Sequence, residues 1–244
     1  MLPCGERMIR EKRKAAYAPC DLVFDADDTL WENNIYFERA FERFVQFLGH
    51  SKLSATEVRA VLDEIELVNN RTYGYGTANF VRNLEQCYRR LAERRIREQD
   101  LARIRALAGH ILGQPVELIE GVEETLAELS TRHRLTLFTK GQPGEQRKKI
   151  ERSGLAVHFH HLTIVKEKDA AAYRKLAAGL GMAPERTWMI GNSPKSDVNA
   201  ALEAGLRAVF IPHAHTWTLE HEPLPEPNER LLVLERFSDL VRYF

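Results

Sequence analysis

The C-terminal half of the chain alternates short apolar runs with segments of helical periodicity, and this alternation constrains the fold more than any other feature. After Gly121 the apolar residues recur at helical spacing, form a short continuous run, and return to helical spacing several times. Short runs that are apolar throughout are typical of strands buried on both faces, and strands that alternate with helices form a parallel sheet. We expect strands at 135–139, 162–165, 188–190 and 208–211, with an edge strand at 231–234.

The segments between these strands are expected to be helices that cover the sheet. Gly154 and Gly205 stand where two of these helices should end, because glycine readily adopts the left-handed conformation that often follows a helix. A basic helix is expected at 144–153, a Pro-rich surface loop at 212–227 and a last helix after the edge strand. Three further helices are marked by apolar residues at helical spacing: Val122, Leu126 and Leu129; Tyr173, Leu176, Ala177 and Leu180; and Val198, Ala201 and Leu202.

A block of purely helical periodicity, residues 33–118, precedes this region. Phe37, Phe41 and Phe44 share one helical face, and later segments of the block repeat the pattern. A polar turn containing glycine, at 69–76, separates two of these helices. Because the helices have apolar faces of their own, we expect them to pack together as a helical domain.

An apolar run from Leu22 to Phe24 stands before the helical block, where a single strand would have no partner. The sheet otherwise lacks its opening strand, so we assign 22–25 to the sheet and treat the helical block as an insertion. The sequence therefore predicts an α/β fold. Its parts are a doubly wound, Rossmann-like parallel-sheet core formed by 18–32 and 119–244, a helical domain at 33–118 inserted after the first strand, and an N-terminal extension at 1–17.

An acidic cluster directly follows the first strand. Asp25, Asp27 and Asp28 repel one another, and a bound cation is the commonest reason for a folded protein to hold such carboxylates together. Asp25 and Asp27 alternate, so on an extended chain their side chains point the same way. The cluster also suits an acidic turn or a helix N-cap, because Asp and Thr are good capping residues.

Polar residues also follow the other predicted strands. Because ligands of such sheets bind outside the carboxyl ends of the strands, we expect these residues to converge at one edge. Transfer of a phosphoryl group needs cations to neutralise charge, hydroxyl and amide donors to hold oxygens, and a nucleophile. The residues that supply these groups are Thr139, Lys140 and Gly141 after the second strand, Lys166 and Lys168 after the third, and Asn192 and Asp197 after the fourth.

With these motifs the chain resembles the haloacid dehalogenase superfamily, whose members are mostly phosphatases, over about residues 18–244. The segment 25–30 resembles the DxDxT motif of that family. Phe138-Thr139 resembles the second motif of that family, and Lys166 or Lys168 resembles the third. The fourth motif is similar to Gly191-Asn192-Ser193 with Asp197. The helical insertion resembles the family's helical cap of the first type.

The resemblance implies an aspartyl-phosphate mechanism. Asp25 would be the nucleophile, and Asp27 would protonate the leaving group and then deprotonate the attacking water. The implied phosphate-binding groups are Thr139, Lys140, the Gly141 amide and Lys168. The implied cofactor is Mg²⁺, with Asp25, the carbonyl oxygen of Asp27, Asp197 and Asn192 as its site.

Two positions of these motifs need comment. Lys168 and Lys166 both suit the third motif; we prefer Lys168, because it directly precedes a helix and its distance from Tyr173 resembles the family's spacing between the lysine and an aromatic residue. Asn192 stands where the family commonly has aspartate. A neutral amide there can still hold a water or orient Asp197, but it lowers the negative charge at the metal.

The predicted function is Mg²⁺-dependent hydrolysis of a small phosphorylated metabolite. A 2-haloacid dehalogenase of the same superfamily needs no acid to protonate a halide, so Asp27 favours phosphoryl transfer. A phosphomutase is a further alternative. A non-catalytic, phospho-accepting signalling module uses similar residues, but it places its acceptor on a middle strand and is shorter. The turn at 69–76 either contacts the substrate or is a solvated loop.

The composition of the chain limits the kinds of partner that we expect it to bind. Lys plus Arg and Asp plus Glu number 35 each, so net charge gives no reason to expect nucleic acid or a membrane as a partner. Three scattered cysteines and no secretory signal indicate a cytoplasmic protein, which we expect to be a monomer or homodimer. The histidines, among them His213 and His215, have no accompanying cysteine or carboxylate set, so surface or packing roles are expected.

Overall fold

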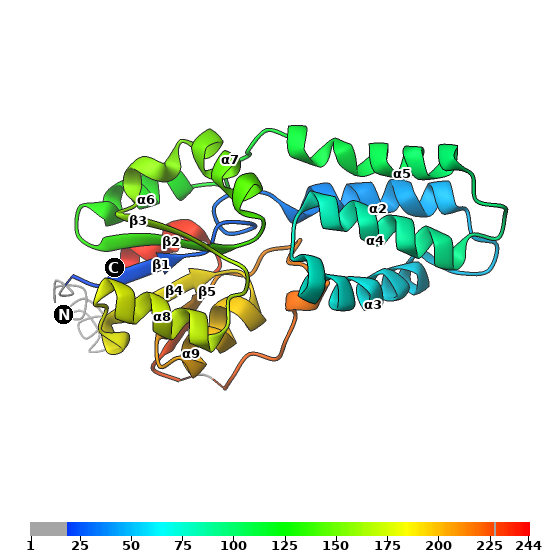
Figure 1. The fold of residues 1–244 in the computed structure, drawn as a ribbon. Helices are drawn as coiled ribbons and strands as arrows, with labels where there is room; N and C mark the ends of the chain where they lie inside the picture. Colours follow the sequence, from blue (N-terminus) through cyan, green and yellow to red (C-terminus); the bar gives the residue numbers. More distant parts are fainter. Residues whose placement is uncertain (1–18, 227) are drawn as a thin grey trace, which may run out of the picture.

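The computed structural model describes residues 19–226 and 228–244, and its core is a six-stranded sheet (Figure 1). All neighbouring strands are parallel, in the order β3-β2-β1-β4-β5-β6. This topology confirms the predicted fold class. The direction of winding reverses at β1, and such switch points are where α/β proteins bind ligands. The strands are β1 (Asp21–Phe24), β2 (Arg134–Lys140), β3 (His161–Val165), β4 (Thr187–Gly191), β5 (Arg207–Phe210) and β6 (Leu231–Val233).

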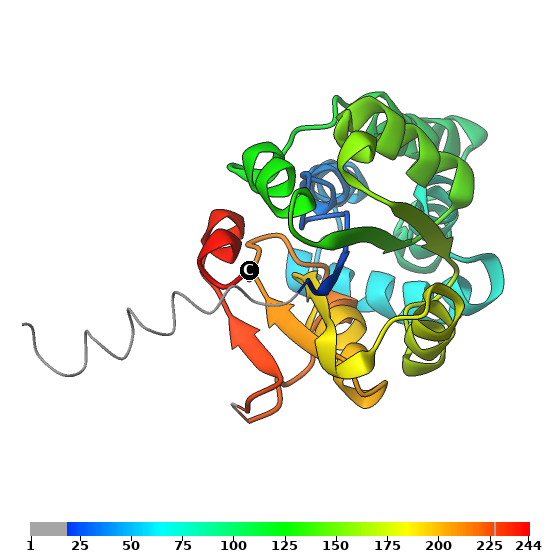
Figure 2. The ribbon, with the colours of Figure 1, turned by 90° about the vertical axis from the view of Figure 1, so that its left-hand side faces the viewer.

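Helices cover both faces of the sheet, as the view along the sheet in Figure 2 shows. Side chains alternate along β1: Leu22 and Phe24 join one hydrophobic cluster, whereas Val23 joins the cluster on the other face. The elements around the sheet are α6 (Val122–Ser130), α7 (Pro143–Ser153), α8 (Ala170–Leu180), a π-helical turn η4 (Pro194–Asn199), α9 (Ala200–Glu203) and η6 (Phe237–Arg242). The expected last helix is thus a 3₁₀ turn, η6.

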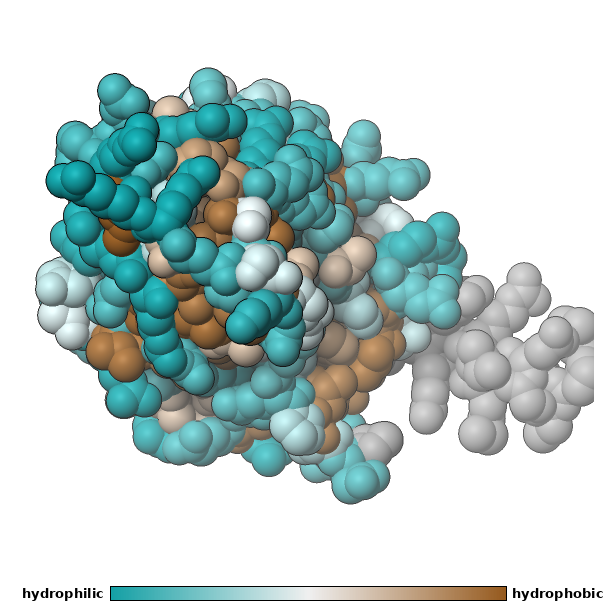
Figure 3. Space-filling view, turned by 90° about the vertical axis from the view of Figure 1, so that its right-hand side faces the viewer, coloured by the Kyte–Doolittle hydropathy of each residue, from teal (hydrophilic) through white to brown (hydrophobic). Residues whose placement is uncertain are grey.

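Four helices lie beyond the carboxyl edge of the sheet (Figure 1). They enclose a hydrophobic cluster of their own, in which Phe44, Leu62 and Tyr88 are buried. Seen from this end, the surface is mostly hydrophilic with hydrophobic areas between the charged side chains (Figure 3). The helices are α2 (Asn34–Leu48), α3 (Ala55–Tyr73), α4 (Thr77–Leu91) and α5 (Glu98–Gly109).

The separate hydrophobic cluster leads us to propose that 33–118 is a domain inserted after β1, here called the cap. The core domain would then comprise 18–32 and 119–244. The expected extension at 1–17 lies outside the described residues. Within the described part of the chain, no helix is both long and apolar enough to cross a membrane.

The connection from β1 to the cap explains Asp28. Its carboxylate accepts hydrogen bonds from the backbone N–H groups of Asn33 (2.9 Å) and Asn34 (3.0 Å), at the start of α2. Asp28 has a positive φ of 61°, a conformation that aspartate tolerates better than most residues. The interpretation of Asp28 as a turn and capping residue is therefore confirmed.

Two predicted loops differ from the structure. The turn at 69–76 is shorter than predicted, because α3 continues to Tyr73 and ends at Gly74, which has a φ of 74°. The Pro-rich segment 212–227 is not merely a surface loop. It includes the short helix η5 (Thr218–Glu220), which contacts α3 of the cap, and Glu220 is buried.

Candidate active site

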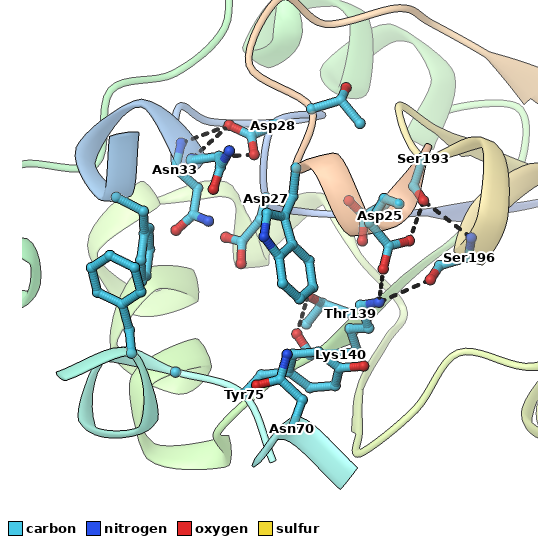
Figure 4. A pocket seen from close by; sticks show the side chains of 18 of the residues that line it. Asp25, Asp27, Asp28, Asn33, Asn70, Tyr75, Thr139, Lys140, Ser193 and Ser196 are labelled. Atoms are coloured by element: carbon cyan, nitrogen blue, oxygen red, sulfur yellow. Dashed lines mark hydrogen bonds and ion pairs between the residues drawn. The ribbon is translucent and has the colours of Figure 1, made fainter. Parts of the chain in front are cut away.

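A cavity of about 160 Å³ lies where the carboxyl edge of the sheet faces the cap. Its walls combine the segment after β1, the end of β2, the turn after β4 and residues of α3 and α4. Figure 4 shows side chains from these segments around the cavity, among them Asp25, Asp27, Thr139, Ser193 and the cap residue Tyr75. The structure thus brings the polar residues of the strand ends to one place.

Lys168 joins two carboxylates at the base of the cavity. Its Nζ donates to Oδ1 of Asp25 (2.7 Å) and also contacts Oδ1 of Asp197. All three residues are buried, whereas Lys166 is exposed. Asp169 caps α8 by accepting from the Ala172 N–H, which places Lys168 directly before the helix. Of the two candidate lysines, the structure therefore places Lys168 beside Asp25.

The charges of this buried group depend on one another. Burial alone favours the neutral amine of Lys168, but the carboxylates of Asp197 and Asp25 raise its pKa well above the usual value, so it stays protonated. Burial raises the pKa of Asp197, an effect that the Lys168 ammonium opposes. Two buried carboxylates facing one ammonium form a site that favours a further positive charge.

Asp197 is positioned by the turn after β4. Its Oδ2 accepts a hydrogen bond from the Ser193 N–H (2.9 Å). Gly191 has no side chain, and a Cβ there would lie 2.2 Å from the same Oδ2. Only glycine leaves room for the Asp197 carboxylate, which explains why this residue ends β4.

Thr29 connects Asp25 with Asn192. Its hydroxyl lies 3.3 Å from Oδ2 of Asp25 and 3.1 Å from Oδ1 of Asn192, and it accepts from the Asn192 N–H (3.2 Å). The Asn192 amide nitrogen donates to Thr216 Oγ1 (2.9 Å), which turns the amide oxygen towards Thr29. The last residue of the DxDxT segment therefore holds both the first and the fourth motif in place.

Asp27 faces a different set of partners from Asp25. Its carboxylate accepts from Nζ of Lys149 (2.6 and 2.7 Å), from the Trp31 indole (2.7 Å) and from the Gln146 amide (3.1 Å). Gln146 and Lys149 are three residues apart on α7 and so share a face of that helix. Neither residue was predicted to belong to the site. Their spacing, directly after the second motif, was the available signal.

Thr139 and Gly141 differ in what they offer to a ligand. The Thr139 hydroxyl accepts a hydrogen bond from the Gln146 amide (2.7 Å) and lines the cavity. The Gly141 N–H instead donates to the carbonyl of Val165 (3.1 Å), because the pairing of β2 with β3 continues one residue beyond β2. The backbone pairing therefore occupies this amide in the present arrangement, and its binding of phosphate stays a prediction.

Lys140 contacts groups that the sequence did not suggest. Its Nζ pairs with the buried Glu220 carboxylate, donates to Ser196 Oγ (2.9 Å) and lies 4.8 Å from the centre of the Tyr75 ring. Glu220 also accepts from the Ser193 hydroxyl. Burial alone would raise the pKa of Glu220, but Lys140 and the hydroxyls of Ser193 and Ser196 hold this pKa below its usual value. Lys140 is thus fixed at the cavity wall by an ion pair.

The histidine interpretation also needs a correction. His213 lies beside two carboxylates, 3.3 Å from Glu32 and 3.8 Å from Asp28. One side-chain ligand atom from each of the three lies within 4.8 Å of the others, a spacing at which they could hold a metal ion. Folding brings these distant segments together, which the local sequence around His213 did not reveal.

The implied Mg²⁺ fits the donors at the end of β1 and β4. Asp25 and Asp197 present carboxylate oxygens, and Asn192 presents an amide oxygen beside them. Oxygen-only donors suit a hard cation such as Mg²⁺. The excess of buried negative charge over the single Lys168 ammonium also favours a bound cation.

Comparisons with known proteins identify the family of this chain. Phosphoserine phosphatase from Thermus thermophilus is 29% identical over 189 residues, which cover 72% of this chain and 70% of that protein. N-acylneuraminate-9-phosphatase from Rattus norvegicus is 31% identical over 118 residues, covering 46% of this chain and 48% of that protein. A crystal structure of a haloacid dehalogenase-like family hydrolase from Xanthomonas campestris has a TM-score of 0.78 and 30% identity, covering 93% of this chain and 96% of that one. The model of the family described as haloacid dehalogenase-like hydrolase matches residues 22–205. The chain therefore belongs to the haloacid dehalogenase-like hydrolase family.

Proposed function

We propose that the chain is a Mg²⁺-dependent phosphatase that hydrolyses a small phosphorylated metabolite through an aspartyl-phosphate on Asp25. The observation that carries this proposal is the buried pairing of Asp25 with Lys168 at the base of a cavity that the cap covers. The two phosphatases named above are relatives, and they support a phosphate monoester as the substrate.

Asp25 is well placed to act as the nucleophile. Lys168 holds one of its oxygens and Thr29 the other, so the carboxylate is oriented before the substrate arrives. In the first step an Asp25 oxygen bonds to phosphorus while the bond from phosphorus to the leaving oxygen breaks. The Lys168 ammonium offsets the negative charge of both Asp25 and the phosphoryl group.

Asp27 would supply the proton for the leaving group and remove one from the water that hydrolyses the intermediate. It is held at present by Lys149, Trp31 and Gln146. We propose that the substrate's leaving oxygen replaces one of these contacts during turnover. An acidic residue at this position also favours a phosphatase over a dehalogenase.

The phosphoryl oxygens would bind the Thr139 hydroxyl and the Lys168 ammonium. The Thr139 hydroxyl accepts from Gln146 and donates over 3.4 Å to the Lys140 carbonyl, a long contact that a phosphoryl oxygen would replace. Mg²⁺ would be held by Asp25, Asp197, Asn192 and the Asp27 carbonyl, and it would supply positive charge to the phosphoryl oxygens. Lys140 adds positive charge at the cavity wall, although Glu220 is its direct partner.

The cap argues for a small substrate. Two hydrogen bonds hold the cap against the core beside the cavity: the Thr77 hydroxyl donates to Glu145 (3.2 Å), and the Tyr75 hydroxyl donates to Glu167 (2.7 Å). A closed site excludes water and macromolecules, which favours hydrolysis of a small ester by a controlled water.

The test is hydrolysis of p-nitrophenyl phosphate with and without Mg²⁺. We expect turnover that requires the metal, is abolished in Asp25→Asn and is strongly reduced in Asp27→Asn. Asp21→Asn is the matched control, because Asp21 lies at the other end of β1 and pairs with Arg134. Full activity of Asp25→Asn would overturn the mechanism, and release of halide from 2-chloropropionate without phosphatase activity would favour a dehalogenase.

A further inference from the structure

The cap side of the cavity contains a buried carboxylate, Glu66 of α3. The residue is only 4% exposed, and it lines the same cavity as Asp25. Its Oε2 accepts a hydrogen bond from the indole of Trp217 (3.2 Å). No described residue donates a hydrogen bond to its Oε1. One oxygen of a buried carboxylate therefore lacks a protein partner and is available to a ligand.

The nearby positive charge does not neutralise Glu66. Arg59 pairs with Glu38, and its guanidinium lies 3.6 Å from the centre of the Phe41 ring. Within the described part of the chain, Glu66 forms no ion pair, and Asp63 adds a further negative charge on the same helix. Burial raises the pKa of Glu66 to about 7, although the charge of Arg59 opposes this effect. A cation placed against Glu66 would favour its ionised form.

The surroundings of Glu66 suit a small organic group. The cavity wall contributed by the cap includes the rings of Phe37 and Phe80 and the amides of Asn70 and Asn83. Nζ of Lys140 lies 4.8 Å from the centre of the Tyr75 ring, and Asn70 and Thr139 line the same cavity (Figure 4), so this wall borders the expected phosphate site. A phosphate monoester bound at Asp25 would therefore direct its organic part towards the cap.

We propose that Glu66 binds an ammonium group in the organic part of the substrate, so that the substrate is a phosphate monoester of a small primary amine. The proposal rests on the proposed phosphatase function. A ligand ammonium would donate to Oε1 and neutralise the buried charge, and charge-assisted hydrogen bonds of this kind are about twice as strong as neutral ones. A neutral ligand would leave the carboxylate unpaired.

The alternative is that Glu66 only holds the cap against the core through Trp217. Glu66→Gln separates the two roles, because the amide oxygen can still accept from the Trp217 indole while the charge is lost. Glu64→Gln is the matched control, since Glu64 is on the same helix and its side chain is exposed and pairs with Arg90.

The experiment compares O-phosphoethanolamine with n-propyl phosphate, in which a methyl group replaces the ammonium, and with 2-hydroxyethyl phosphate. We expect the native chain to prefer phosphoethanolamine in kcat/KM by about tenfold to a hundredfold. Glu66→Gln should lose that preference with little change for n-propyl phosphate, whereas Glu64→Gln should retain it.

Three outcomes would overturn the proposal: no preference in the native chain, an equal loss for all esters in Glu66→Gln, or an equal preference for the hydroxyl ester. Dissociation constants measured by calorimetry on Asp25→Asn, with and without Glu66→Gln, test the same ratio without turnover. If the native chain hydrolyses neither these esters nor p-nitrophenyl phosphate, the proposed function fails, while the ratio of dissociation constants still decides the role of Glu66.

Discussion

Replacing Lys168 by methionine should destabilise the protein strongly. The Lys168 side chain is 1% exposed and is the only cation in contact with Asp25 and Asp197 among the described residues. Methionine keeps an apolar stem of similar length but leaves both carboxylates without their partner. Removing one partner of a buried ion pair costs about 3–5 kcal/mol. For a chain of this size that corresponds to a fall in Tm of roughly 6–20 °C.

Thermal and urea unfolding of Lys168→Met and Lys166→Met, both in EDTA, measure this effect. Lys166 is exposed, so its replacement should change the free energy of unfolding by no more than about 0.5 kcal/mol. Added Mg²⁺ should recover part of the lost stability in Lys168→Met, because the cation would supply charge to the two carboxylates. Equal Tm values for the two variants in EDTA would refute the assignment of a stabilising buried pair, and unchanged phosphatase activity in Lys168→Met would refute its role at phosphate.

Two other substitutions test separate parts of the structure. Lys149→Met removes a donor to both oxygens of Asp27, and we expect kcat for alkyl phosphates to fall about tenfold to a hundredfold. The loss should be smaller for p-nitrophenyl phosphate, because its leaving group needs little protonation. Equal losses of kcat for the two kinds of ester in steady-state assays would contradict this role. Burial lowers the pKa of His133 below its usual value. As the pH falls through about 6.5, this side chain therefore binds a proton in the unfolded chain but not in the folded one, and the free energy of unfolding should decrease. Urea titrations at pH 7.5 and 5.5 should show a smaller decrease in His133→Asn than in the native chain, and identical pH dependence would contradict the reasoning.

The sheet and the convergence of its polar residues could be predicted because they depend on local patterns. Leu22, Val23 and Phe24 form a short apolar run that ends at Asp25, and buried parallel strands have this appearance. Once the strands are parallel, the residues after them must meet at one edge. The position of Lys168 directly before α8 follows in the same way from the Asp169 cap.

The spacing of Gln146 and Lys149 indicates only that they share a helical face, and their contact with Asp27 depends on how that helix packs. Gln146 and Lys149 stand in a basic helix, where most side chains are solvated. Only the packing of α7 against the segment after β1 directs these two towards Asp27. The hydrogen bond from the Gly141 amide to Val165 has a similar cause, since the length of a strand pairing depends on tertiary contacts that no local pattern records.

The segment 212–226 links the cap to the expected phosphate site, and this explains why a Pro-rich loop contains the buried Glu220. Trp217 donates to Glu66 of the cap, while Glu220, three residues later, pairs with Lys140 of the core. Any movement of the cap that carries Trp217 with it must therefore pull on the Glu220 ion pair.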